Sequence, residues 1–132
     1  MQKRLAVFKH FIQDLATLSK CKEYKVAAII TDIDMKQVYS IGINGGPAGL
    51  SNCLCADPGK YSCIHAEMNA LIKNTTDDTN KIMLVTLAPC EQCAAAIINS
   101  GFSKVYYIED WKDNPGVKLL KNADIDAIKI YV

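Results

Sequence analysis

The chain has 132 residues, of which 50% are hydrophobic and 22% are charged, and its formal net charge is +1. This length predicts one domain over residues 1–132 with a single hydrophobic core. The composition excludes a disordered chain. The basic residues are scattered, with no basic arm, which argues against an extended nucleic-acid partner and favours a small substrate.

The N-terminal residues contain neither a signal peptide nor a membrane span. Lys9 and His10 interrupt the only apolar stretch among the first twelve residues. We therefore expect a cytoplasmic protein with no membrane partner, in a reducing compartment. In such a compartment the six Cys are expected to be metal ligands or buried thiols rather than disulfides.

The first half of the chain predicts a helix, a hairpin and a long loop. Apolar residues recur every three or four positions over residues 2–19, as in an amphipathic helix. The apolar run at 26–30 predicts a buried strand, and the turn residues 32–36 followed by the extended segment 38–43 complete a hairpin. Residues 44–63 are rich in turn residues and Cys, and irregular loops of this length are usually functional or held by a ligand.

In the second half, predicted helices alternate with predicted strands. The expected helices lie at 66–74, 91–100 and 117–121, and the expected strands at 82–86, 105–108 and 128–132. Strands that alternate with helices after a hairpin imply an α/β fold. We expect a mixed five-stranded sheet flanked by helices.

Two short segments, each at the start of a predicted helix, carry residues suited to metal chemistry. They are His65-Ala66-Glu67 and Pro89-Cys90-Glu91-Gln92-Cys93, and together they match the signature of zinc deaminases. Two Cys three positions apart at a helix N-terminus can bind one metal ion, because the positive end of the helix favours thiolates. One His and two Cys leave the fourth position of a tetrahedral zinc open for water, which is typical of a catalytic site.

Glu67 is the candidate proton carrier of this site. His65 and Glu67 are two positions apart, so within a regular helix they would point in different directions, and both can serve one site only if His65 lies at the helix cap. Zinc lowers the pKa of its bound water toward about 7. Glu67 would take the proton from this water, deliver it to the ring nitrogen beside the attacked carbon, and then protonate the leaving amine.

Each motif has a structural alternative when it is taken alone. An isolated Cys-x-x-Cys pair is more often a structural zinc or redox motif, and an isolated His-x-Glu has almost no meaning. The joint occurrence, with Cys90 lying 25 residues after His65 (90 − 65) and a strand between them, favours catalytic zinc.

Most of the chain resembles one enzyme family in segments that include both motifs. The segments are 19–21, 25–30, 42–49, 52–53, 64–70, 85–94, 100–101, 105–107 and 115–116. They resemble deoxycytidylate (dCMP) deaminases, most closely the bacteriophage type, within the zinc-dependent cytidine/deoxycytidylate deaminase family. The resemblance implies a three-layer cytidine-deaminase-like fold. It also implies hydrolytic deamination of dCMP to dUMP with release of ammonia, for dTMP supply, in the host cytoplasm if the chain is phage-encoded.

The same resemblance implies substrate contacts. Asn44 would hydrogen-bond the sugar hydroxyl, and main-chain groups near Ala66 would read the pyrimidine. Glu109 and Trp111 follow a predicted strand, where the family places residues on the substrate side. Trp111 could equally be a half-exposed packing residue.

The resemblance also implies a site for the 5′-phosphate of the nucleotide. Arg4 is the only Arg in the chain, so there is no obvious bidentate arginine clamp. Lys22 and Lys25 are the candidates, although either could simply be solvated.

The four remaining Cys suggest a second metal site. Their simplest interpretation is as small buried hydrophobic residues. Some phage relatives carry a second, structural zinc with ligands at positions resembling Cys21, Cys53 and Cys63. Cys55 could complete a closed site of four thiolates.

The family implies oligomerisation and regulation. Its members are typically homohexamers, activated by dCTP and inhibited by dTTP with a Mg²⁺ ion. The effectors bind near a glycine-asparagine-glycine segment, represented here by Gly42, Gly45 and Gly46. The chain departs from the family pattern at Ile43, where tyrosine is usual, and at Ala27, where glycine is usual.

Two alternatives remain open. The chain could be a deaminase of another substrate, such as dCTP, a free nucleoside or tRNA adenosine. Free-nucleoside enzymes do not need the long loop, and tRNA enzymes usually have a more basic surface. From a different class, the chain could be a non-catalytic zinc-binding deaminase-like module, although the presence of Glu67 argues against this.

Overall fold

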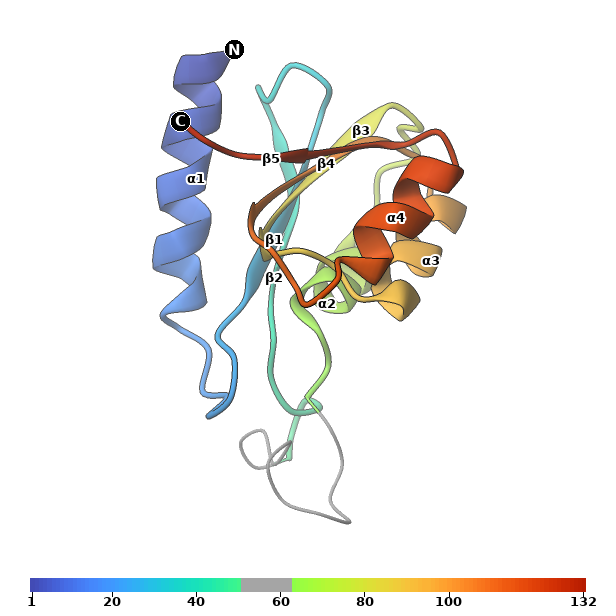
Figure 1. The fold of residues 1–132 in the computed structure, drawn as a ribbon. Coiled ribbons are helices and arrows are strands. Elements are labelled where there is room, and N and C mark those ends of the chain that lie inside the picture. Colours follow the sequence, from blue (N-terminus) through green and yellow to red (C-terminus); the bar gives the residue numbers. More distant parts are fainter. Residues whose placement is uncertain (51–62) are drawn as a thin grey trace.

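A mixed five-stranded sheet forms the centre of the protein (Figure 1). The structure is a computed structural model in which residues 1–50 and 63–132 are described. The strands are β1 (Ala27–Thr31), β2 (Val38–Ile43), β3 (Lys81–Leu87), β4 (Phe102–Glu109) and β5 (Asp126–Lys129), in the spatial order β2-β1-β3-β4-β5. β1 is antiparallel to both β2 and β3, whereas β3, β4 and β5 are mutually parallel. The predicted hairpin and mixed sheet are confirmed.

Helices cover both faces of this sheet. α1 (Gln2–Ala16) lies on one face, and the other face carries α2 (Ala66–Lys73), α3 (Glu91–Asn99) and α4 (Pro115–Asn122) (Figure 1). The order of elements and the three-layer arrangement are therefore as predicted. In the described residues, no helix combines the length and the apolar character that crossing a membrane requires.

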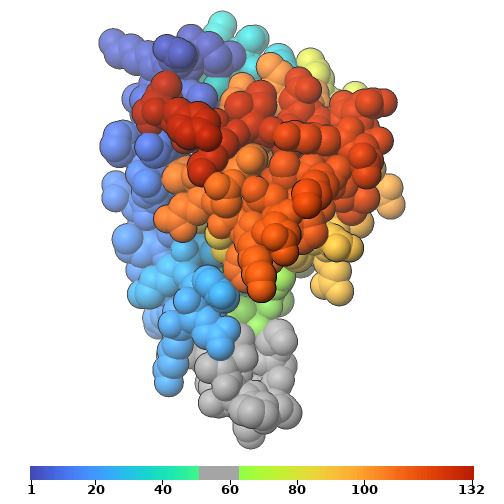
Figure 2. Space-filling view, in the orientation of Figure 1, coloured from blue at the N-terminus to red at the C-terminus, as the bar shows by residue number. Residues whose placement is uncertain are grey.

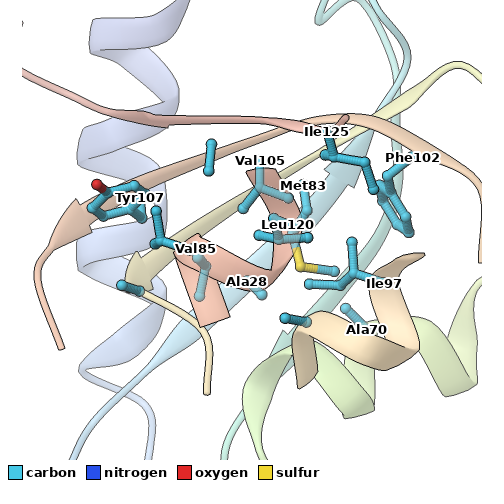
Figure 3. Packing of buried hydrophobic residues seen from close by; sticks show 14 of the residues in the cluster. Ala28, Ala70, Met83, Val85, Ile97, Phe102, Val105, Tyr107, Leu120 and Ile125 are labelled. Carbon is cyan, nitrogen blue, oxygen red and sulfur yellow. The ribbon is translucent and has the colours of Figure 1, made fainter. Parts of the chain in front are cut away.

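The three layers enclose two hydrophobic clusters, one on each face of the sheet. On the α1 side, Ile12 packs with Ile29 and Leu84. On the other side, side chains from β3 and β4 meet side chains from α3 and α4, as Figure 3 shows for Met83, Val85, Val105, Ile97 and Leu120. All five residues of β1 are buried, because a central strand between two helical layers has no solvent-facing side.

Several predicted boundaries were wrong by a few residues, and β4 begins at Phe102 rather than at residue 105. α1 ends at Ala16 rather than near residue 19. α4 begins at Pro115, two residues earlier than predicted, because proline suits the first helical position, where no N–H bond is needed. β5 spans Asp126–Lys129 instead of 128–132, since its parallel pairing with β4 runs only from Asp126 to Lys129.

Candidate metal centre and active site

The N-termini of α2 and α3 bring the two motifs together. His65 is the N-cap residue of α2 and Cys90 is the N-cap residue of α3, and both have extended backbone conformations. Glu67 and Cys93 then fall in the first turns of these helices. The predicted placement of His65 at the helix cap is confirmed, and it explains how residues two apart serve one site.

The ligand atoms of His65, Cys90 and Cys93 form a cluster that fits zinc. Nδ1 of His65 lies 3.3 Å from Sγ of Cys93 and 3.6 Å from Sγ of Cys90, and all three atoms lie within 4.8 Å of one another. A tetrahedral zinc with ordinary bond lengths separates nitrogen and sulfur ligands by about 3.5 Å. Three protein ligands at this spacing leave a fourth position for a small molecule.

The electrostatics of the two thiols also favour a cation. The pKa of Cys90 is lowered to about 3, mainly because Cys93 and then His65 hydrogen-bond to its thiolate. The pKa of Cys93 is raised, first by its hydrogen bond to Cys90 and then by burial. The protein alone thus stabilises one thiolate and opposes the second, and a divalent ion would allow both to ionise.

Glu67 lies beside this cluster in a buried position. Its side chain is only 4% exposed, and burial raises the pKa of the carboxyl group to about 7, against opposing interactions with its own backbone and His65. A carboxyl group with a pKa near neutrality can both accept and donate a proton, which is what a general acid–base catalyst requires.

Close packing on β2 sets the position of α2. A Cβ atom on Gly42 would lie 2.2 Å from the carbonyl oxygen of Ala66 and 2.4 Å from the backbone nitrogen of Ala70, so only glycine allows this approach. Ser40 Oγ donates a hydrogen bond to the Ala70 carbonyl, and Asn69 Nδ2 donates to the Ile43 carbonyl. Gly42, predicted as an effector contact, therefore supports the helix that carries Glu67, and its effector role stays a prediction.

A cavity of about 250 Å³ opens onto the metal cluster. His65, Glu67 and Cys90 line it, as do the buried Ala66 and Trp111. Ala66 therefore borders the site, and the predicted reading of the pyrimidine by main-chain groups near it stays a prediction.

An aromatic pair that the sequence did not reveal forms one wall of this cavity. Tyr24 meets Trp111 edge to face, with ring centroids 5.2 Å apart and planes at 66°. The segments after α1 and after β4, which carry these residues, lie side by side on the face shown in Figure 2. The only sequence signal for Tyr24 was an aromatic residue in a linker beside Lys25.

A second, larger cavity of about 680 Å³ adjoins the first and shares Tyr24 and Trp111 with it. Lys25 and Glu109, both predicted substrate contacts, line this second cavity, as does Lys112, which was not predicted. Lys22, the other phosphate candidate, is exposed and is not among the residues that line the two cavities.

Asn44 lines the metal cavity and is buried, but its side chain is already engaged. Its Oδ1 accepts a hydrogen bond from the Val26 N–H, and its Nδ2 donates one to the Tyr24 carbonyl. One N–H and one lone pair are left for a ligand, so the predicted bond to a sugar hydroxyl stays a prediction. Asn44 additionally holds the segment that carries Tyr24.

The cysteines of the predicted second zinc site are only partly described. Cys21 is buried and lines the metal cavity together with Cys63, whereas Cys53 and Cys55 lie outside the described residues. Cys63 is disulfide-bonded, contrary to the expectation of no disulfides, since neighbouring cysteines that could share a metal ion can also join to each other. A second zinc, which would need Cys63 as a thiolate, stays a prediction.

The other predicted effector glycines lie just after β2. Gly45 and Ile64 exchange two backbone hydrogen bonds, and a Cβ atom on Gly45 would meet nothing within 4 Å. Gly46 follows directly in the chain. Effector binding by either residue stays a prediction.

Comparison with known proteins identifies the family. Residues 2–109 match the family described as the cytidine and deoxycytidylate deaminase zinc-binding region. The chain belongs to this family. Within the cytidine and deoxycytidylate deaminase family, the chain is 32% identical to the deoxycytidylate deaminase of Saccharomyces cerevisiae over 133 residues, which is 87% of this chain and 42% of the yeast protein. It is 40% identical over 72 residues to the deoxycytidylate deaminase of Enterobacteria phage T4, covering 51% of this chain and 37% of the phage protein.

Solved structures of the family share the fold. The dCMP deaminase of cyanophage S-TIM5, crystallised in complex with dCMP and dUMP, superposes with a TM-score of 0.88 at 26% identity, over 96% of each chain. The chain spans about half the length of the curated relatives it matches. The predicted resemblance and the predicted cytidine-deaminase-like fold are confirmed.

Proposed function

We propose that this deaminase converts dCMP and water into dUMP and ammonia. The observation that carries the proposal is the convergence of His65 Nδ1 and the two cysteine sulfurs at zinc-ligand spacing beside the buried carboxyl group of Glu67. A relative of the same fold that was crystallised with dCMP and dUMP supports the choice of substrate.

The residues of the site can be assigned to the steps of this reaction. Zinc held by His65, Cys90 and Cys93 would supply Lewis acidity at the open position. Glu67 would accept a proton from the attacking water and pass it to the ring nitrogen next to the attacked carbon. It would then accept the second proton, from the hydroxyl group now on that carbon, and deliver it to the departing amine. The carbon–nitrogen bond breaks, the carbonyl of the product forms, and ammonia leaves.

The two cavities suggest how the nucleotide lies. The smaller cavity, next to the metal cluster, suits the pyrimidine ring, with main-chain groups near Ala66 at its edge. The larger cavity, with Lys25 at its side, suits the sugar and the 5′-phosphate. Trp111 lines both cavities and would contact both parts of the ligand.

The decisive experiment compares substrates at equal concentration. The protein is incubated with dCMP, dCTP, deoxycytidine and cytidine, and the reaction is followed by ultraviolet absorbance and by ammonia release. We expect dCMP to react fastest. Preferential turnover of a nucleoside or of dCTP would overturn the substrate, and a zinc-loaded protein that deaminates none of them would favour the non-catalytic module.

Regulation and assembly are proposed on the family resemblance alone. We propose a homohexamer whose activity responds to dCTP and to dTTP with Mg²⁺, acting in the host cytoplasm if the chain is phage-encoded. Sedimentation velocity with and without these nucleotides tests the assembly. Initial rates at low dCMP concentration test the response to dCTP and dTTP. Rates that do not change when either nucleotide is added would contradict this regulation.

A further inference from the structure

The turn between β4 and α4 is organised by the side chain of Asn114. Its Oδ1 accepts a hydrogen bond of 2.7 Å from the Trp111 N–H, and its Nδ2 donates one of 2.8 Å to Asp110 Oδ1. The Asn114 N–H donates in turn to the Trp111 carbonyl at 2.9 Å. Asn114 thus binds both the backbone of Trp111 and the residue before it.

The backbone of this turn adopts an unfavourable conformation, which the hydrogen bonds of Asn114 help to stabilise. Asp113 and Asn114 both have left-handed conformations, with φ of 62° and 43°. Two consecutive non-glycine residues in this region cost conformational energy, which neighbouring contacts must offset. Asparagine tolerates the conformation better than most residues and supplies the hydrogen bonds as well.

Contacts at both ends connect the turn to the rest of the site. On the outer side, Asp110 Oδ2 lies 2.6 Å from Lys129 Nζ of β5. On the inner side, a Cβ atom on Gly116 would lie 2.0 Å from the Pro89 carbonyl oxygen, so the start of α4 packs directly on the backbone that leads to Cys90. The conformation of the turn is therefore coupled to the position of Trp111 relative to the metal cluster.

We propose that Asn114 is a positioning residue, whose side-chain hydrogen bonds hold Trp111 edge to face against Tyr24 as the wall between the two cavities. Trp111 lines both cavities, so a shift of its backbone would alter the space for the nucleotide on both sides of the ring. As far as it concerns substrate affinity, this inference rests on the proposed deaminase function.

The chain offers a direct test, because Trp111 is its only tryptophan. Asn114→Gly keeps the left-handed backbone accessible and removes both side-chain hydrogen bonds. Asn114→Asp keeps an acceptor for the Trp111 N–H but places a carboxylate beside Asp110. Asp124→Gly is the matched control, since Asp124 is exposed, has a φ of 61° and lies beyond α4.

In the ligand-free protein, we expect tryptophan emission to move to longer wavelength and acrylamide quenching to increase in Asn114→Gly, with a smaller change in Asn114→Asp. The KM for dCMP should rise about tenfold in Asn114→Gly, the size expected when one aromatic contact is lost, while kcat changes less. Asp124→Gly should match the parent protein in emission and KM.

If Asn114 had a purely structural role, Asn114→Gly would lower the melting temperature. Tryptophan emission and KM, measured below the unfolding transition, would then equal those of the parent. The proposal would be overturned if Asn114→Gly showed the same tryptophan emission and quenching as the parent. It would also be overturned if the variant were active with an unchanged KM for dCMP. If the parent proves inactive on dCMP, the proposed function fails, but the emission measurements still decide the role of Asn114. If Asn114→Gly does not fold, the same measurements on Asn114→Asp decide it.

Discussion

Glu67 is a buried carboxyl group that would be ionised in some steps of the proposed reaction and protonated in others. Its side chain is 4% exposed, and burial raises its pKa to about 7. An ionised carboxylate is costly to bury, whereas a protonated one costs far less, so the site keeps the two forms close in free energy. This balance would allow a single carboxyl group to serve as base and then as acid, as we propose for Glu67.

Replacing Glu67 with glutamine should separate proton transfer from folding. We expect Glu67→Gln to bind zinc and to fold like the parent, because the two side chains have nearly the same shape. Turnover of dCMP should fall roughly hundred- to ten-thousand-fold, the usual contribution of a general acid–base catalyst. Steady-state kinetics and zinc content by atomic absorption check this.

Glu91→Gln is the matched control for this substitution. Glu91 is an exposed carboxylate at the start of α3. Its variant should retain the activity of the parent. Equal activity of Glu67→Gln and the parent would remove Glu67 from the mechanism.

At the scale of elements, two helix N-termini create the site. α2 presents His65 from its cap and Glu67 from its first turn, and α3 presents Cys90 and Cys93 in the same way. The positive ends of both helices stabilise the anionic thiolate and carboxylate groups. The site therefore depends on how closely α2 and α3 approach the sheet and each other.

Gly42 controls the approach of α2 to β2. In Gly42→Ala the new methyl group would meet backbone atoms of Ala66 and Ala70, which cannot rotate away. We expect a loss of about 1–3 kcal/mol in the free energy of unfolding, as for other overpacked sites. Because the displaced helix carries Glu67, kcat should also fall, and chemical denaturation together with kinetics measures both effects.

The comparison for Gly42 is Gly45→Ala. A Cβ atom on Gly45 would have open space around it, so this variant should keep the stability of the parent. Full stability of Gly42→Ala would show that α2 is not held by this contact.

At the scale of the whole molecule, a bound metal ion would cross-link segments far apart in the sequence. His65 caps α2, whereas Cys90 caps α3 and Cys93 lies in the first turn of α3. A ligand that binds only the folded state stabilises it, by about 4 kcal/mol when its concentration is a thousand times Kd. Zinc is therefore expected to stabilise the fold as well as to serve chemistry.

Removing zinc should accordingly lower the melting temperature of the parent. Differential scanning calorimetry with and without a strong chelator measures the change. The His65→Ala variant, which lacks one ligand, should show a much smaller difference between the two conditions. A parent melting temperature that does not respond to the chelator would contradict a zinc cross-link at this site.

The sequence alone determined the order of elements and the metal-binding motifs. Both depend on local chemistry: apolar periodicity decides whether a segment forms a helix or a strand, and a helix start places residues three apart on one side. His65, Glu67, Cys90 and Cys93 were predicted before their distances were known because their two motifs match the signature of zinc deaminases. The resemblance to a family extended this to Trp111 and Lys25, which do line cavities at the site.

Only the tertiary structure decided which linkers meet at the site. The contact between Tyr24 and Trp111 joins segments separated by most of the chain, and no local pattern encodes that pairing. The proposed role of Asn114 depends on a left-handed turn, which its own hydrogen bonds and the ion pair between Asp110 and Lys129 of β5 support. The packing role of Gly42 depends on the position of α2. Side-chain periodicity is a property of neighbours along the chain, whereas the walls of a cavity are set by the packing of the whole sheet and its helices.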